Sequence, residues 1–141
     1  MPALRARTAA VLAAAALLTG GCSTIDQVTG TVDSAANTVQ VCTEATTTVV
    51  GTFGRVSNAV AGARPGQLQQ TQAEITAEFE TLHGRLEPLI ADAADADVKA
   101  SLEELDRRVQ GWAADPGTFL DVDKATLDQL VTGLRNACSP T

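Results

Sequence analysis

The sequence predicts an all-α fold, an up-down antiparallel four-helix bundle stapled by one disulfide. Apolar and small residues recur in alternating steps of three and four along four stretches, which is the spacing of one face of a helix. Short segments rich in Gly, Pro and Asp separate these stretches. Because short loops make successive helices antiparallel, a bundle is the simplest way to bury all four faces.

The first stretch predicts a helix over residues 38–62. β-Branched residues at 46–50 and glycines at 51 and 54 favour a strand instead, but one helical register is kept throughout, so we prefer the helix. The register is weakest over residues 23–36, which we expect to form a partly helical or flexible tether. The predicted buried face consists of Val39, Cys42, Thr46, Val49, Phe53, Val56 and Val60.

The second stretch predicts a helix over residues 67–93, after a stop signal formed by Gly62, Pro65 and Gly66. Pro88 follows Gly84 by one helical turn, so its ring faces a glycine carbonyl and predicts a kink without requiring a break. The predicted buried face consists of Leu68, Ile75, Phe79, Leu82, Leu86, Leu89 and Ala93.

The last two helices are predicted over residues 97–113 and 122–138, with a turn at 115–117 between them. Asp97 is the expected N-cap of the third helix. The fourth begins near Asp121 or Asp123. The predicted buried residues are Val98, Leu102, Leu105, Val109 and Trp112 in the third helix, and Leu127, Leu130, Val131, Leu134 and Cys138 in the fourth.

The N-terminal segment has the pattern of a signal peptide. Arg5 and Arg7 precede an apolar run over residues 9–18 that is too short to span a bilayer, and small residues end it. The motif Leu18-Thr19-Gly20-Gly21-Cys22 follows. It resembles the lipobox of bacterial lipoproteins, in which a peptidase cleaves before a cysteine that carries diacylglycerol.

This resemblance implies a signal peptide at residues 1–21, a lipidated tether at 22–36 and a helical bundle domain at 37–141. It also implies lipidation of Cys22 and anchoring at the extracytoplasmic face of the cell membrane, for which two acyl chains are enough. The alternative is an ordinary secretory signal that a cysteine follows by chance.

The mature chain is strongly acidic. The sequence has 10 Lys and Arg residues against 17 Asp and Glu; cleavage after residue 21 removes Arg5 and Arg7 and no acidic group, which leaves 8 against 17 and a net charge of −9. A nucleic-acid partner is therefore not expected. The 120 residues that remain are enough for one domain and too few for two.

The cysteine count predicts a disulfide between Cys42 and Cys138. Once Cys22 is lipidated it cannot pair, and an even pair in an oxidising compartment favours a bridge. The alternative is two reduced thiols in the core. A metal site would need more ligands than these cysteines and His83 supply, so no metal or cofactor is expected.

Sites of catalysis are not indicated by the sequence. Glu80-Thr81-Leu82-His83 fits the spacing of di-iron bundles, but such a centre needs a second copy and His83 is the only histidine, so we interpret it as a surface or boundary residue. The acidic groups 92–97 and 121–128 lack the calcium-loop pattern and fit helix N-terminal charges. We predict that the protein is not an enzyme.

Two functions remain. The first is a non-catalytic binding or structural module at the cell envelope. The alternative is a carrier of a small apolar ligand or lipid in the bundle core, where the small residues Ala45, Gly51 and Gly54 leave room for it. Close helix packing is the other explanation of these small residues.

The helix lengths predict a protruding tip. The first two predicted helices are longer than the last two, so the loop that joins them should project by about 10 Å. This tip surface, residues 56–72, carries Arg64 and no acidic residue, and Arg55 lies just before it. We hypothesise that Arg55 and Arg64 contact an acidic envelope component or a partner protein. A solvated hairpin without a partner is the alternative.

Overall fold

The computed structural model describes residues 21–139, with side chains from Asp33 onward. The chain divides into two units, residues 1–35 and 36–141. In the first unit the described backbone, residues 21–35, is helical. Of the two states expected for the tether, partly helical or flexible, the structure has the helical one. Residues 1–20 of the predicted signal peptide, and the side chain of Cys22, lie outside the described residues.

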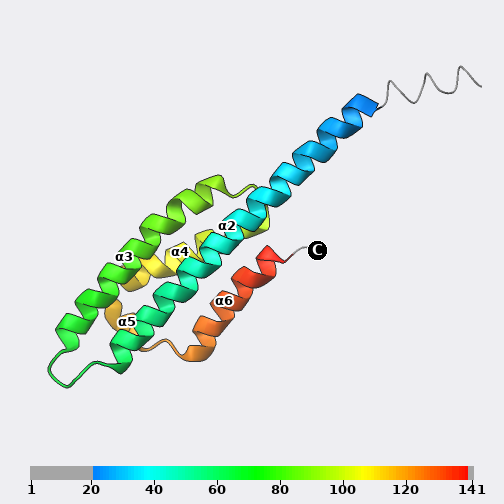
Figure 1. Cartoon of the computed structure of the whole chain (residues 1–141). Coiled ribbons are helices and arrows are strands. Elements are labelled where there is room, and N and C mark those ends of the chain that lie inside the picture. Colours follow the sequence, from blue (N-terminus) through cyan, green and yellow to red (C-terminus); the bar gives the residue numbers. More distant parts are fainter. Residues whose placement is uncertain (1–20, 140–141) are drawn as a thin grey trace, which may run out of the picture. The chain divides into compact units, whose positions relative to one another are not determined.

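Every secondary-structure element in residues 21–139 is a helix (Figure 1), so the predicted all-α class is confirmed. The β-branched run after Thr46 is helical, because its neighbours in the register are buried against other helices and tertiary packing outweighs propensity. The helices are α2 (Gly21–Ala61), α3 (Leu68–Asp92), α4 (Ala96–Ala114), α5 (Pro116–Leu120) and α6 (Lys124–Cys138).

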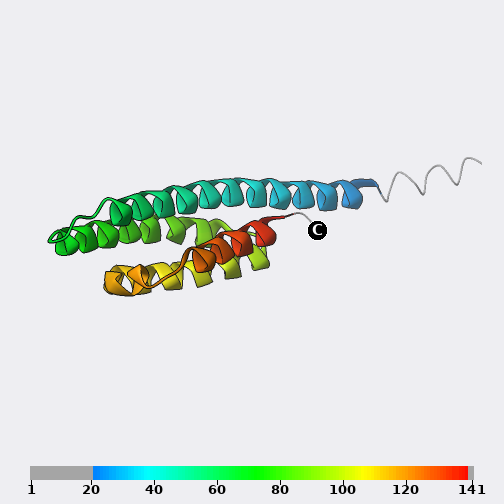
Figure 2. The same cartoon turned by 90° about the horizontal axis from the view of Figure 1, so that it is seen from below.

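Helix α3 runs antiparallel to the part of α2 that lies in the second unit. Near the start of this part, the Asn37 amide donates to the Asp92 carbonyl at 3.0 Å and accepts from the Ala94 N–H at 3.1 Å. Near its end, the Arg55 guanidinium pairs with Glu78 at 2.8 Å. The start of α2's packed portion therefore meets the end of α3 (Figure 2).

Helix α4 in turn runs antiparallel to α3. The Thr76 hydroxyl, early in α3, donates to the Ala113 carbonyl at the end of α4 at 3.2 Å. His83, in the middle of α3, contacts Asp106 of α4 at 2.8 Å. Helix α4 also contacts α5 and α6, and α3 contacts α5.

The core is a single apolar cluster with aromatic rings at one end. Phe79 is fully buried and its ring lies 5.0 Å from that of Phe119 and 5.4 Å from that of Trp112, measured between centroids. Phe53 adds a fourth ring, 6.2 Å from Trp112. Trp112 is 7% exposed, so its predicted place in the core is confirmed. The Phe79–Phe119 and Phe53–Trp112 contacts are edge-on, an arrangement that stabilises ring pairs beyond their burial.

The predicted disulfide between Cys42 and Cys138 is present and links α2 to the last residue of α6. It spans a sequence separation of 96 residues. Cys42 is buried, and Cys138 packs against the core cluster. A crosslink over so long a loop restricts the unfolded chain strongly.

Three details of the predicted elements are wrong. Val39 and Leu68 are 66% and 55% exposed: Val41 and Cys42 face the core in place of Val39, and the first buried residue of α3 is Thr71. The N-cap of α4 is Asp95, whose carboxylate accepts from the N–H groups of Asp97 and Val98 at 2.9 and 3.0 Å. Asp97 is therefore in the first turn, where its charge still favours the helix dipole.

A fifth helix, α5, was not predicted. It follows Asp115 directly, begins at Pro116 in the first helical position, and buries Phe119 against the aromatic cluster. Helix α6 begins after Asp123, whose carboxylate accepts from the Thr126 N–H at 2.8 Å, in agreement with one of the two predicted starts. Helix α3 passes through Pro88 without a break.

Candidate functional site

The α2–α3 loop forms the tip that the helix lengths predicted. It covers residues 62–67, and Figures 1 and 2 both show it beyond the turn between α4 and α5. Gly66 has φ of +92°, a conformation that glycine adopts without a steric penalty. Arg64 is exposed in this loop. The tip surface thus presents one cation and no carboxylate of its own.

Arg55, the other predicted contact residue, is engaged within the protein. Its Nε donates to Glu78 Oε2 at 2.8 Å, and its Nη2 donates to the hydroxyl of the buried Thr52 at 3.1 Å. Glu78 belongs to α3 and lies outside the segment considered for the tip. The structure therefore assigns Arg55 a role in joining α2 to α3 and leaves Arg64 as the exposed arginine of the predicted pair.

An apolar groove lies where the end of α2 meets α5 and the start of α6. Its volume is ≈380 Å³. Of the two α5 residues that line it, Phe119 is buried and Leu120 is 37% exposed. Its lining consists of Ser57, Val60, Ala61, Phe119, Leu120, Val122, Lys124 and Leu127.

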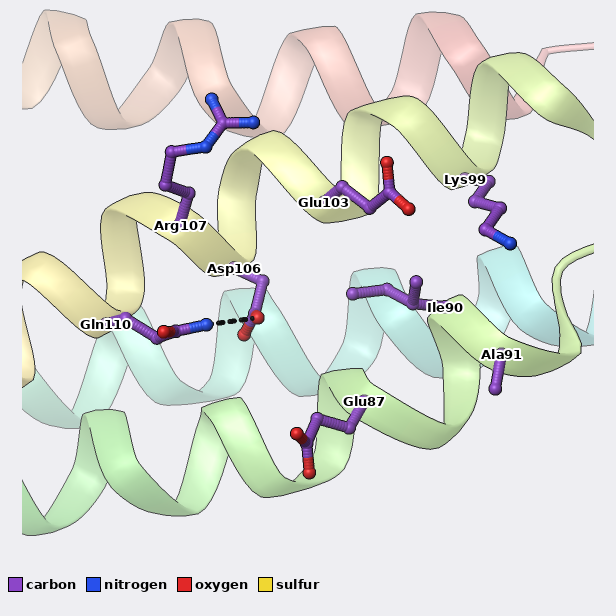
Figure 3. A pocket seen from close by; sticks show the side chains of 8 residues that line it. All are labelled: Glu87, Ile90, Ala91, Lys99, Glu103, Asp106, Arg107 and Gln110. Carbon is purple, nitrogen blue, oxygen red and sulfur yellow. Dashed lines mark hydrogen bonds between the residues drawn. The ribbon is translucent and has the colours of Figure 1, made fainter.

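A second, polar groove lies between α3 and α4 (Figure 3) and has a volume of ≈520 Å³. In its wall, Gln110 Nε2 donates to Asp106 Oδ2 at 2.7 Å. Asp106 is buried although it is charged, with 7% of the residue exposed. The lining consists of Glu87, Ile90, Ala91, Lys99, Glu103, Asp106, Arg107 and Gln110.

His83 stands beside this polar groove at the boundary between core and surface, as predicted, with 34% of its side chain exposed. Its Nδ1 donates to Asp106 Oδ1 at 2.8 Å, and its Nε2 lies 3.6 Å from Glu87 Oε1. The hydrogen bond to Asp106 raises the pKa of His83 above its usual value; burial opposes this, and the charges of Asp106 and Glu87 add to it.

The Glu-x-x-His spacing is not part of a larger cluster of metal-ligating side chains in the described part of the chain. Glu80, the partner of His83 in the Glu-x-x-His spacing, is exposed. Within residues 21–139, no group of three or more His, Cys, Asp or Glu side chains is arranged to hold an ion. Both oxygens of Asp106 already accept hydrogen bonds, from His83 and Gln110.

The small residues proposed to make room for a ligand do not do so. Ala45 is fully buried and is itself part of the core. Gly54 is exposed, and a Cβ added there would meet nothing within 4 Å, so it borders solvent and not the interior. At Gly51 an added Cβ would meet the Arg55 side chain at 3.5 Å. The glycines therefore explain neither an interior cavity nor close helix packing.

No family model, no curated protein and no solved structure matches this chain. Among the helices within the described residues, none combines the length and the apolar character that crossing a membrane requires.

Proposed function

We propose that this protein is a lipoprotein held at the extracytoplasmic face of the cell membrane through Cys22, and that it acts there as a non-catalytic binding module. The observation that carries this proposal is the bond between Cys42 and Cys138. Disulfides of this kind persist in oxidising compartments outside the cytoplasm, which is where a lipobox-type signal sends a chain.

We further propose that the four long helices of residues 37–141 form an up-down antiparallel bundle. The antiparallel pairs α2–α3 and α3–α4 support this arrangement. The contact of α4 with α6, and the disulfide between α6 and α2, are consistent with closure of the four helices. In such a bundle the disulfide lies toward one end and the tip surface at the other.

The tip surface is the proposed contact with a partner. Arg64 is exposed there and residues 56–72 contain no acidic residue, whereas the mature chain carries a net charge of −9. A cation in this setting favours an acidic protein or another acidic component of the envelope. Because Arg55 is paired with Glu78, we assign the contact to Arg64 alone.

We expect Arg64→Glu to abolish crosslinking of the partner, and Cys22→Ser to move the protein out of the membrane fraction. Charge reversal replaces attraction by repulsion at the contact, and Ser cannot carry the thioether-linked lipid. The experiment is crosslinking in the native host, followed by membrane fractionation and mass spectrometry of the captured proteins.

Arg85→Glu is the matched control. Arg85 is exposed on α3, so this substitution makes the same change in charge at a position outside the tip surface. Capture should survive in this variant. Identical captured proteins from wild type and Arg64→Glu would contradict the tip contact, and unchanged membrane recovery of Cys22→Ser would contradict the anchor. The two arms therefore fail independently.

A second candidate function is carriage of a small apolar ligand or lipid. The observation that favours it is the apolar groove, where the edge of Leu120 and the buried ring of Phe119 lie beside half-buried aliphatic residues of α2 and α6. Concave surfaces with apolar walls and few polar groups are the usual sites for such ligands. The groove lies at the surface, so this site replaces the interior one that the sequence suggested.

We expect lauric acid to change the fluorescence of Trp112 and to bind at least tenfold more weakly to Leu120→Asp. Trp112 is the only tryptophan and the chain has no tyrosine; its ring lies 5.3 Å from that of Phe119 in the groove wall. A carboxylate at position 120 would oppose entry of an apolar chain. Leu68→Asp, at another exposed leucine, should bind like wild type. Equal affinities for all three proteins would exclude the groove as the site.

A further inference from the structure

The contact between His83 and Asp106 is a charged hydrogen bond that joins α3 to α4. His83 Nδ1 donates to Asp106 Oδ1 at 2.8 Å. Gln110 Nε2 donates to the other carboxylate oxygen at 2.7 Å, as Figure 3 shows. Asp106 is 7% exposed, so its carboxylate depends on these two donors in place of water. A buried charge of this kind is stable only while it is paired and hydrogen-bonded.

The imidazole of His83 lies between two carboxylates. Asp106 reaches its Nδ1 from α4, while Glu87, one turn further along α3, lies 3.6 Å from its Nε2 and is 66% exposed at its side chain. When both nitrogens carry protons, each faces an acceptor. Lys99, Glu103 and Arg107 of α4 are the other charged residues lining the adjoining polar groove.

We propose that His83, Asp106 and Glu87 form a pH-sensitive clasp between α3 and α4, closed while the imidazole is charged and weakened when it loses its proton. After deprotonation the Nδ1–H can still donate, but both hydrogen-bond donors of Asp106 are then neutral and the positive charge of the imidazolium is lost. The buried carboxylate then disfavours the packed interface. This inference does not depend on the membrane anchor or on the partner at the tip.

The direction of the pH effect follows from the raised pKa of His83, whose main cause is the hydrogen bond to Asp106. The stabilisation is fully present below the pKa of the unfolded chain, about 6.5. It is lost as pH rises through the higher pKa of the folded state. For each unit by which the folded-state pKa exceeds the unfolded-state pKa, the ratio of folded to unfolded protein is about tenfold lower at a pH above both pKa values than at a pH below both.

The experiment is an NMR titration of the purified full chain, followed at the imidazole Cε1–H of His83. The chain has one histidine, so the signal needs no assignment. We expect a midpoint above 6.5 in wild type and a midpoint at or below 6.5 in Asp106→Asn, which keeps the shape of the side chain and removes its charge. Glu87→Gln should give a smaller decrease, because Glu87 is more exposed than Asp106.

Glu103→Gln is the matched control, because Glu103 lines the same groove and the same charge is removed. Its midpoint should equal that of wild type. A wild-type midpoint at or below 6.5 would overturn the clasp, as would equal midpoints in wild type and Asp106→Asn. If Asp106→Asn does not fold, the free energy of unfolding of His83→Gln is measured against pH instead. The decrease that wild type shows above pH 6.5 should be absent in this variant. A pH profile equal to that of wild type would overturn the proposal.

Discussion

Removal of the Cys42–Cys138 disulfide should lower the free energy of unfolding by about 4 to 5 kcal/mol. The bridge closes a loop with a sequence separation of 96 residues, and for loops of about that length the chain-entropy model gives about 4.7 kcal/mol. Domains of this size are stable by only about 5 to 15 kcal/mol, so the loss is a large part of the total. The measurement is urea unfolding of wild type and of the double variant Cys42→Ala, Cys138→Ala.

The matched control is reduced wild type, which has the native side chains without the bond. Its midpoint should fall together with that of the double variant, since both remove the same crosslink and differ only in two sulfur atoms near the core. Thiol labelling of the denatured, unreduced protein provides the independent check. If both cysteines are modified under these conditions, no bridge exists in solution and the predicted loss has no physical basis.

The sequence was most informative where a helix buries one narrow face. All five residues predicted for the third helix face, from Val98 to Trp112, are buried. The disulfide was also predictable, because removing Cys22 from the count leaves one pair. In both cases a single constraint, the helical period or the parity of cysteines, selects the answer without knowledge of distant contacts.

The short helix α5 shows where the same reasoning stops. Asp115-Pro116-Gly117 has the composition of a turn, and a helix of five residues is too short to display a period. Phe119 is buried because Phe79 and Trp112 lie next to it in space. Only the packed structure brings these rings together, so the sequence offered no local signal for the helix.

The candidate site residues illustrate a similar limit. His83 was correctly placed at the boundary, but 17 acidic residues could have been its partner and nothing in the spacing selects Asp106, which is 23 positions away. Arg55 was expected to be available at the tip, and Glu78 of α3 pairs with it instead. Ion pairs between helices depend on rotation and axial shift, which periodicity alone does not fix.

Replacement of Phe79 by Ala should have the second large effect, lowering the free energy of unfolding by about 3 to 5 kcal/mol. Phe79 is fully buried and its ring contacts those of Phe53, Trp112 and Phe119, so its loss leaves a cavity among three rings that belong to α2, α4 and α5. The measurement is urea unfolding followed by Trp112 fluorescence. Because Trp112 borders the cavity, its native emission should change as well.

Leu68→Ala is the matched control on the same helix. Leu68 is 55% exposed, so the substitution removes little buried area and should change stability by less than about 0.5 kcal/mol. The contrast tests whether the aromatic cluster holds α3 against its neighbours or whether the disulfide alone maintains the fold. Similar small losses for Phe79→Ala and Leu68→Ala would show that the rings near the tip are not tightly packed, and would also remove the buried wall on which the apolar groove depends.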